Sequence, residues 1–284
     1  MVEDNRFTYG GADGEQIAGF RWSGQGAPKA VVQLAHGAGE HSLRYLEPLT
    51  PIIDAGYLIY SADHRGHGAT AGPDKLGDFG PGGAAAAIDD MAVLSRRIRQ
   101  EHADLPLILL GHSMGAAFAQ VYFTKHHQLL DALILSGTAA AWLPRGERRD
   151  MNSLYPNPRT DYDWLSRDAA EVDKYIADPL CKIRFTPESG RSFRTIGEQA
   201  TDPGYLQQVK KDLPVYIFVG DEDPVNDRLA RVTPLLERYR DAGLTDVELK
   251  VYPGGRHEML NETNRDEVVA DLLAWLEARF GRNA

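Results

Sequence analysis

The residues best suited to chemistry in this sequence surround a serine placed between two glycines. Residues 111–115 read Gly-His-Ser-Met-Gly, after an apolar run at 105–110 and before a helix-forming stretch at 116–119. A strand, a sharp turn and a helix in that order form the context of a G-x-S-x-G nucleophile elbow. The glycines avoid clashes in the tight turn, and Ser113 then lies at a helix N-terminus, where N–H groups favour a developing oxyanion. Because so short a motif also arises by chance, it needs partners elsewhere in the chain.

A nucleophilic serine needs a base to remove its proton, and the base needs a carboxylate to orient it. In the α/β-hydrolase arrangement the acid and then the histidine follow the serine in the chain, each on a loop after a strand. His257 follows an expected strand at 247–252 and is the only histidine after His127, so it is the candidate base. Three adjacent carboxylates after the run at 214–219 are candidates for the acid, and each also suits a solvated loop or a helix cap: Asp221, Glu222 and Asp223.

Backbone N–H groups complete this arrangement as an oxyanion hole. One donor is the residue after the serine, Met114, and the other lies on the loop after an early strand, where Ala38 follows the apolar run 30–35. Because the donors are backbone groups, their side chains can vary. Losing one such donor typically lowers the rate by ~10²–10³.

Nine histidines also raise the question of a metal site. His64 with His67, or His36 with His41, could be taken for ligand pairs, with Asp63 as a third ligand. These histidines lie in glycine-rich turns instead of at i, i+4 on a helix, and no Cys or Glu completes a familiar ligand set. The glycines at 80–83 do not form a dinucleotide loop, because no strand leads into them. We therefore expect no metal and no cofactor.

The elements that must position these residues alternate between strands and helices. Near-continuous Val/Ile/Leu runs separated by helical patterns indicate a parallel sheet covered on both faces. This rhythm breaks at about Thr138, and residues 138–211 carry aromatic and charged side chains but no apolar strand. We interpret 138–211 as an inserted, mainly helical cap on a core formed by 1–137 and 212–284.

Composition limits the partners and the compartment. The 284 residues include 41 acidic and 31 basic side chains, a net charge of -10, which argues against nucleic-acid binding and strong attraction to anionic lipids. Cys181 is the only cysteine, so no intrachain disulfide is expected. The acidic N-terminus does not read as a signal peptide, and no apolar run approaches the ~20 residues that span a bilayer. We expect a cytoplasmic protein without stable membrane insertion, whose cap can touch a lipid surface transiently.

Taken together, these segments resemble α/β-hydrolases of the monoacylglycerol lipase and lysophospholipase-like group, which is related to the serine aminopeptidases. Four segments carry the resemblance, in order: 36–45 (HGAGEHSLRY), 63–68 (DHRGHG), 111–115 (GHSMG) and 257–262 (HEMLNE). It implies an α/β-hydrolase fold, with a mostly parallel eight-stranded sheet, helices on both faces and an inserted cap. It also implies that Ser113 is the nucleophile, Asp223 the acid and His257 the base, with oxyanion donors at Ala38 and Met114.

The resemblance says less about the substrate. Glu40 and Arg44 would lie near the alcohol side of the site or form a fold-stabilising ion pair. Trp142 and Trp164 suit an apolar pocket over Ser113 or would pack a small core within the cap. The insertion is larger than the compact lid of the best-known monoacylglycerol lipases, which leaves the acyl and alcohol preferences open.

The function expected from these residues is hydrolysis of a small-molecule acyl ester, of monoacylglycerol or lysophospholipid type, by a serine carboxylic-ester hydrolase. A serine aminopeptidase or amidase is the first alternative, because acidic cap residues such as Asp161, Asp163 or Glu171 could bind a substrate amine. A ligand-binding receptor with a hydrolase fold is the second. The complete set of nucleophile, base and acid argues against the receptor.

Overall fold

The computed structural model describes residues 2–143, 150–200 and 203–281. Its centre is an eight-stranded sheet in the order β1-β2-β4-β3-β5-β6-β7-β8. The β1–β2 and β2–β4 pairs are antiparallel and every later pair is parallel, which confirms the predicted sheet. The strands are β1 Glu3–Gly10, β2 Gln16–Ser23, β3 Ala30–Ala35, β4 Tyr57–Ala62, β5 Leu107–His112, β6 Ala132–Ser136, β7 Val215–Gly220 and β8 Val247–Tyr252.

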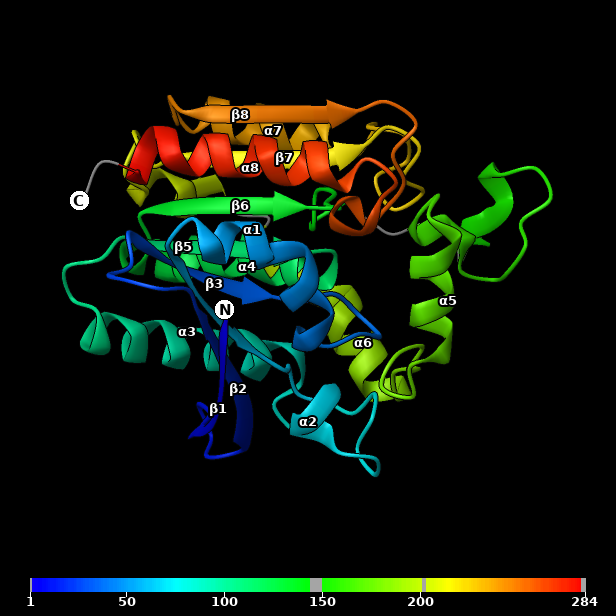
Figure 1. The fold of residues 1–284 in the computed structure, drawn as a ribbon, viewed down its shortest axis with the longest axis horizontal. Helices are drawn as coiled ribbons and strands as arrows, with labels where there is room; N and C mark the ends of the chain where they lie inside the picture. Colours follow the sequence, from blue (N-terminus) through cyan, green and yellow to red (C-terminus); the bar gives the residue numbers. More distant parts are fainter. Residues whose placement is uncertain (1, 144–149, 201–202, 282–284) are drawn as a thin grey trace.

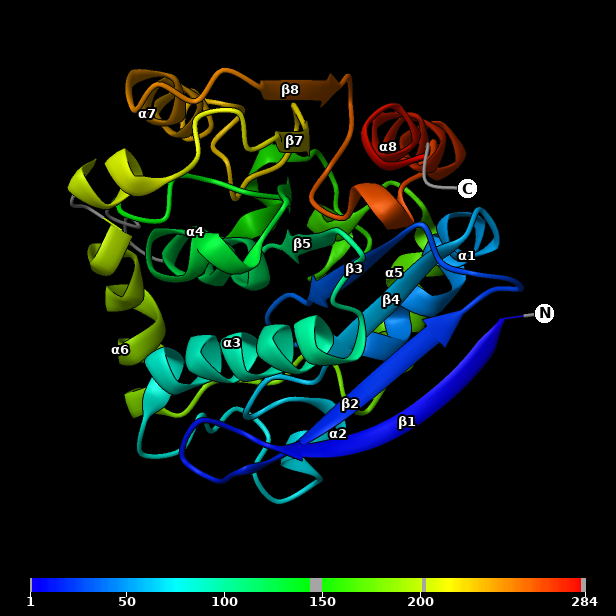
Figure 2. The same ribbon diagram turned by 90° about the vertical axis from the view of Figure 1, so that its left-hand side faces the viewer.

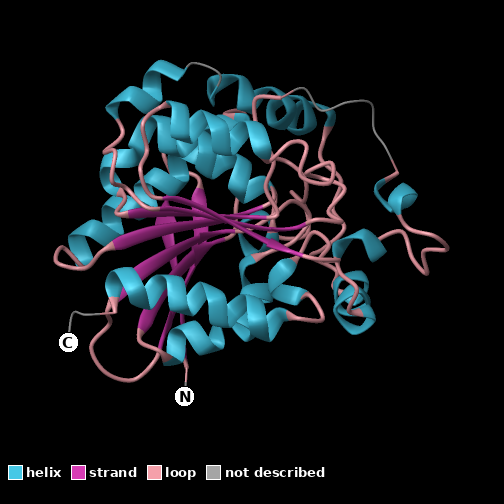
Figure 3. Ribbon diagram, turned by 90° about the horizontal axis from the view of Figure 1, so that it is seen from above, coloured by secondary structure: helices cyan, strands magenta, loops and turns pink. Residues whose placement is uncertain are grey.

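Helices cover both faces of the sheet, as Figures 2 and 3 show. One face carries α3 (Gly83–Glu101), α4 (Met114–His126) and α7 (Thr233–Asp241). The other carries α1 (Leu46–Asp54) and α8 (Arg265–Phe280). The central strands β3 to β7 are buried along their whole length because helices lie above and below them, which explains their unbroken apolar sequences.

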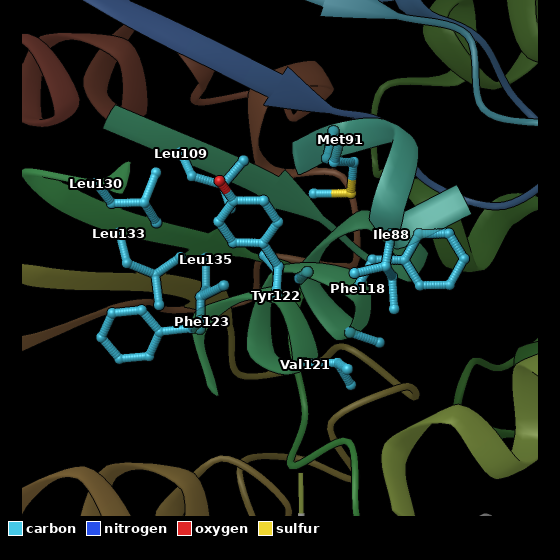
Figure 4. Close-up of a cluster of buried hydrophobic side chains, with 14 of the residues drawn as sticks. Ile88, Met91, Leu109, Phe118, Val121, Tyr122, Phe123, Leu130, Leu133 and Leu135 are labelled. Carbon is cyan, nitrogen blue, oxygen red and sulfur yellow. The ribbon is translucent and has the colours of Figure 1, made fainter. Parts of the chain in front are cut away.

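The α4 helix holds the nucleophile elbow in a rigid setting. It packs on β5 and β6 and is covered by α3, so the described side chains from Met114 to Thr124 are all buried. Figure 4 shows Phe118, Tyr122 and Phe123 of α4 among apolar side chains from the sheet and from α3. Burying one such large apolar side chain contributes about 1.5–3 kcal/mol. The start of α4 is therefore fixed by the core behind it.

The chain between β6 and β7 contains helices and no strand within its described residues. Its elements are η3 Met151–Leu154, η4 Asp163–Leu165, α5 Ala169–Ala177, α6 Pro187–Ile196, η5 Gly197–Ala200 and η6 Pro203–Gln208. In Figure 1, α5 stands beyond the arrowheads of β6 and β8, at the carboxyl ends of the parallel strands. The α6 and η5 segments pack on α3 and α4 instead. Only the first half of the insertion thus extends past the sheet.

Among the described residues, no helix is long and apolar enough to cross a membrane.

Candidate active site

Ser113 lies in the sharp turn between β5 and α4. Its backbone has φ +53° and ψ −111°, a left-handed conformation that a residue with a side chain seldom adopts. A Cβ on Gly115 would lie 2.1 Å from the backbone oxygen of Ala35, and one on Gly111 would lie 2.6 Å from the oxygen of Gly115. Glycine is therefore required at both positions for the helix to start directly against β3. The Ser113 side chain is half-buried and lies at the carboxyl end of β5.

Three side chains from three separate loops meet at this turn. His257, after β8, has its Nε2 2.8 Å from Ser113 Oγ. Its Nδ1 lies 2.9 Å from Oδ2 of Asp223, after β7. Asp223 and His257 are 0% and 2% exposed, so little water competes for these contacts. The predicted serine, histidine and aspartate therefore form one continuous chain of hydrogen-bonding contacts.

The structure distinguishes the three adjacent carboxylates. Asp221 accepts a hydrogen bond from the backbone N–H of Gly254, and Glu222 forms an ion pair with Arg228 on the surface. Only Asp223 of the three contacts His257. Its other carboxylate oxygen accepts the N–H of Val225 at 2.8 Å, which fixes the orientation of the group.

The imidazole of His257 is tuned by its surroundings. Burial disfavours the charged ring, but the adjacent Asp223 carboxylate outweighs this effect, and the pKa of His257 is raised above its usual value. Neighbouring His112 lacks such a partner, and burial lowers its pKa to about 4. An imidazole that is stabilised as a cation next to a serine hydroxyl is suited to accept the hydroxyl proton.

Backbone N–H groups flank Ser113 on both sides. Met114 opens α4, so its N–H is one of the first-turn donors that have no partner inside the helix. On the other side, a Cβ on Gly37 would lie 3.2 Å from Cβ of Ser113, which places the loop after β3 against the serine. Ala38 is exposed on this loop, whereas Gly37 and Gly39 are buried. Both predicted donors thus belong to segments in place to face an oxyanion.

Glu40 and Arg44 lie in a buried ion-pair network beside the site. Arg44 pairs with Glu40 at 2.6 Å and makes two hydrogen bonds to Glu258, at 2.8 and 2.7 Å. Glu40 also accepts the N–H of Gly37 and the hydroxyl of Tyr45. Burial would raise the pKa of Glu258, but Arg44 reverses this effect and holds it at about 2. Their charges are satisfied within the protein, which favours the ion-pair interpretation over substrate contact.

Replacing Arg44 with methionine is expected to lower the free energy of unfolding by about 3–5 kcal/mol, because two buried carboxylates would lose their shared cation. Arg159→Met is the matched control, since Arg159 pairs with Asp173 on the surface, where both side chains are about half exposed. Water and salt screen such an exposed pair, so its loss is expected to change the stability far less. Urea denaturation of both variants measures the difference, and equal losses of stability would contradict the role given to the network.

The two predicted tryptophans lie in different places. The ring of Trp164 is 5.0 Å from the ring of His257, so it forms part of the wall of the site. The structure does not place Trp142 there: its ring lies 3.8 Å from the guanidinium of Arg238 on α7. The preceding backbone is fixed to the core, because the N–H of Ala141 donates to the side chain of Gln120 on α4. Trp142 therefore packs beside α7, which corrects the pocket expected from sequence.

The insertion contacts the loop after β8, which carries His257, and the sequence did not predict this contact. The N–H of Glu258 donates to the carbonyl of Leu165 at 2.8 Å, and Ser166 Oγ donates to the carbonyl of Asn261 at 2.8 Å. Arg167 pairs with the fully buried Glu262. The segment 164–167 thus runs along the loop that carries His257 and holds it in place. These partners lie more than ninety residues apart in sequence, so no local pattern predicts them.

The glycine-rich turns at 36–41 and 63–68 are joined by histidines. His36 Nε2 accepts the N–H of His64 at 2.9 Å, and its ring lies 5.2 Å from that of His67. Burial lowers the pKa of His67 to about 3, so this ring is neutral near pH 7. Asp63 accepts two backbone N–H groups. The turn at 63–68 therefore braces residues 36–41, the loop that carries Ala38 (the oxyanion loop).

A mostly parallel sheet of this order, with serine, aspartate and histidine after β5, β7 and β8, defines an α/β-hydrolase. Residues 26–264 match the family described as "Serine aminopeptidase, S33". The chain belongs to this family of hydrolases.

Relatives with assigned functions cover nearly the whole chain. A monoacylglycerol lipase of Mycolicibacterium smegmatis is 30% identical over 97% of this chain and 99% of its own. The human monoglyceride lipase is 32% identical over 94% of this chain and 89% of its own. A carboxyl esterase from Bacillus coagulans, solved in complex with glycerol, superposes with a TM-score of 0.86 at 27% identity, covering 97% of this chain and 98% of its own. The chain is a carboxylic-ester hydrolase.

Proposed function

We propose that this enzyme hydrolyses monoacylglycerols to a fatty acid and glycerol through an acyl-enzyme on Ser113. The observation that carries the proposal is the chain of contacts from Ser113 through His257 to Asp223, with distances of 2.8 and 2.9 Å. The substrate class rests on the relatives, two of which are named monoacylglycerol or monoglyceride lipases.

The first half-reaction transfers the acyl group to the enzyme. His257 Nε2 takes the proton of Ser113 as Oγ forms a bond to the ester carbonyl carbon. The carbonyl oxygen becomes an oxyanion, which accepts hydrogen bonds from the N–H groups of Met114 and Ala38. The intermediate then breaks its bond to the glycerol oxygen, which receives the proton from His257. Asp223 stays ionised throughout and stabilises the imidazolium.

The second half-reaction releases the fatty acid. Water takes the place of glycerol, and His257 removes one of its protons while the oxygen attacks the acyl carbon. Collapse of the second intermediate breaks the bond to Ser113 Oγ and returns the proton to it. The enzyme ends in its starting state, and each cycle consumes one ester and one water molecule.

The insertion 138–211 is the part of the chain that we assign as the cap over the substrate. The described chain has two large apolar side chains that are markedly exposed, Met151 at 38% and Tyr205 at 45%, and both belong to this insertion. Met151 belongs to the first half of the insertion, beyond the sheet, and its exposure supports transient contact of the cap with aggregated lipid, whereas Tyr205 lies on η6, which packs on α4. The cytoplasmic location inferred from composition stays a prediction.

An aminopeptidase activity is less well supported. A substrate amine would need a free carboxylate, but Asp163 already accepts hydrogen bonds from Arg159 and Thr160. Glu171 pairs with Lys174 and Arg265. Two of the three acidic residues that motivated this alternative are thus occupied by neighbours within the protein.

A substrate series tests the proposal. Monoacylglycerols are expected to be hydrolysed with kcat/KM roughly 10- to 10²-fold above proline-naphthylamide, because a substrate ammonium buried without a partner carboxylate costs about 1.5–3 kcal/mol. Lysophospholipids with the same acyl chain separate the two lipid classes, and p-nitrophenyl esters report acyl length without a glycerol group. Faster cleavage of the naphthylamide than of every acyl ester would overturn the proposal in favour of the aminopeptidase.

A further inference from the structure

Three side chains capable of binding a metal meet between the oxyanion loop and the insertion. Among the described residues, His41, Asp178 and Cys181 are a group whose ligand atoms all lie within 4.8 Å of one another. His41 Nε2 is 2.8 Å from Asp178 Oδ2. His41 and Cys181 are buried, at 6% and 3% exposure. The cluster is separate from the groups assigned to the reaction.

Asp178 and Cys181 are the first and last residues of one tight turn. Residues 178–181 read Asp-Pro-Leu-Cys, with aspartate and proline at the first two positions that such turns favour. The N–H of Cys181 donates to the carbonyl of Asp178, and the N–H of Leu180 donates to its Oδ1 at 2.8 Å. One carboxylate oxygen is therefore fixed by the backbone, and the other is turned to His41.

The next residue fastens this turn to the oxyanion loop. Lys182 has φ +61°, a left-handed conformation that is unfavourable for a lysine and is often found at functional sites. In this conformation its N–H donates to the carbonyl of Gly39 at 2.9 Å. The strained backbone thus brings Cys181 to the loop that carries His41.

An imidazole nitrogen, a carboxylate oxygen and a sulfur form a donor set that suits Zn²⁺. Tetrahedral zinc with three protein ligands leaves a fourth position for water. The Asp178 side chain is 28% exposed and offers an access route, and Leu180 N–H supplies the outer contact that orients this ligand. Burial raises the pKa of the Cys181 thiol, and nearby Arg44, which pairs with Glu40 and Glu258, opposes this effect only in part. The charge of a bound cation is therefore what holds the thiolate in this site.

We propose that His41, Asp178 and Cys181 form a binding site for Zn²⁺ that fastens the oxyanion loop to the insertion. The expectation of no metal came from histidine pairs within single turns. In the site proposed here, Asp178 and Cys181 lie more than 130 residues after His41 in the chain. The competing assignment is a structural thiol, since Cys181 also packs against Leu165 and Tyr175.

Cobalt spectroscopy of the untagged protein tests the site directly. Because Cys181 is the only cysteine, a thiolate-to-Co²⁺ charge-transfer band can come from this side chain alone. We expect this band and intense visible absorption typical of a tetrahedral ion, both displaced by Zn²⁺. Zn²⁺ at a hundredfold excess over Kd is also expected to raise Tm by about 5 °C. Absence of the band would overturn the proposal and leave Cys181 as a structural thiol.

Variants then assign the ligands. Cys181→Ala, His41→Gln and Asp178→Asn are each expected to weaken Zn²⁺ binding at least tenfold by calorimetry. His126→Gln is the matched control, because His126 also lies near a carboxylate, Asp89, but has no thiol beside it. If a ligand variant fails to fold, a measurement on the wild-type protein replaces it: bound Zn²⁺ should protect the Cys181 thiol from an alkylating reagent. Equal Zn²⁺ affinity in Cys181→Ala, or no protection of the thiol, would contradict the site.

Discussion

Replacing Ser113 with alanine is expected to lower kcat for monoacylglycerol hydrolysis by about 10⁶-fold, as loss of a nucleophile does in other serine hydrolases. The substitution removes the atom that forms the acyl-enzyme while leaving His257, Asp223 and the oxyanion donors in place. The surrounding elbow is held by α4, which is buried in the core. We therefore expect KM to change far less than kcat, and Tm to stay close to the wild-type value.

Two measurements separate loss of the nucleophile from loss of structure. A fluorophosphonate probe should label the wild-type protein and leave Ser113→Ala unlabelled. Ser61→Ala is the control, because Ser61 is a fully buried serine on β4 whose hydroxyl donates to Ser42. This control is expected to keep its kcat and to lose only stability. Wild-type rates in Ser113→Ala would refute the acyl-enzyme mechanism.

Much of the fold could be predicted from the sequence because each central strand is buried on both faces. Such strands need apolar side chains at every position, so their sequences stand out from the amphipathic helices between them. The bounds of β3 coincide with the apolar run at 30–35. The nucleophile elbow could also be predicted, because its tight turn requires glycine at two fixed positions around the serine. A Cβ on Gly111 or Gly115 would clash with neighbouring backbone.

The choice among the three acidic candidates was harder, because it depends on the path of one loop. After Asp223 the chain makes a left-handed turn through Asp227, Arg228 and Leu229, none of which is a glycine. Buried Asn226 anchors this turn by donating to the carbonyl of Gly220. The path of this loop determines which carboxylate reaches His257. No sequence pattern of residues 221–229 predicts that path.

Contacts between distant segments account for the rest of what was missed. Arg44 and Glu258 are 214 residues apart, so the partner of Arg44 could not be read from its surroundings in sequence. The displacement of Trp142 has the same origin, because Gln120 of α4 fixes the backbone beside it. Local patterns predicted which elements form, whereas contacts between segments distant in sequence decided which side chains reach the site.

Replacing Asp223 with asparagine is expected to lower kcat by about 10⁴-fold, because an amide no longer holds the imidazole in the required tautomer. The Asn Nδ2 group can donate to His257 Nδ1, which would leave the proton on Nε2. That nitrogen then faces Ser113 Oγ as a donor and cannot accept its proton. Asp221→Asn is the matched control, since Asp221 only accepts the N–H of Gly254 and an amide oxygen can do the same.

The pH dependence of kcat/KM distinguishes this role from a structural one. The base must be neutral, so wild-type activity should fall as the pH drops through the raised pKa of His257. Asp223→Asn removes the negative charge that opposes burial, so burial then lowers the pKa and the acid limb should move to lower pH. Asp221→Asn should keep the wild-type limb. Removal of a carboxylate in contact with His257 must lower the pKa of the ring. An acid limb that stays at the same pH in Asp223→Asn would therefore show that another group sets the protonation of the base.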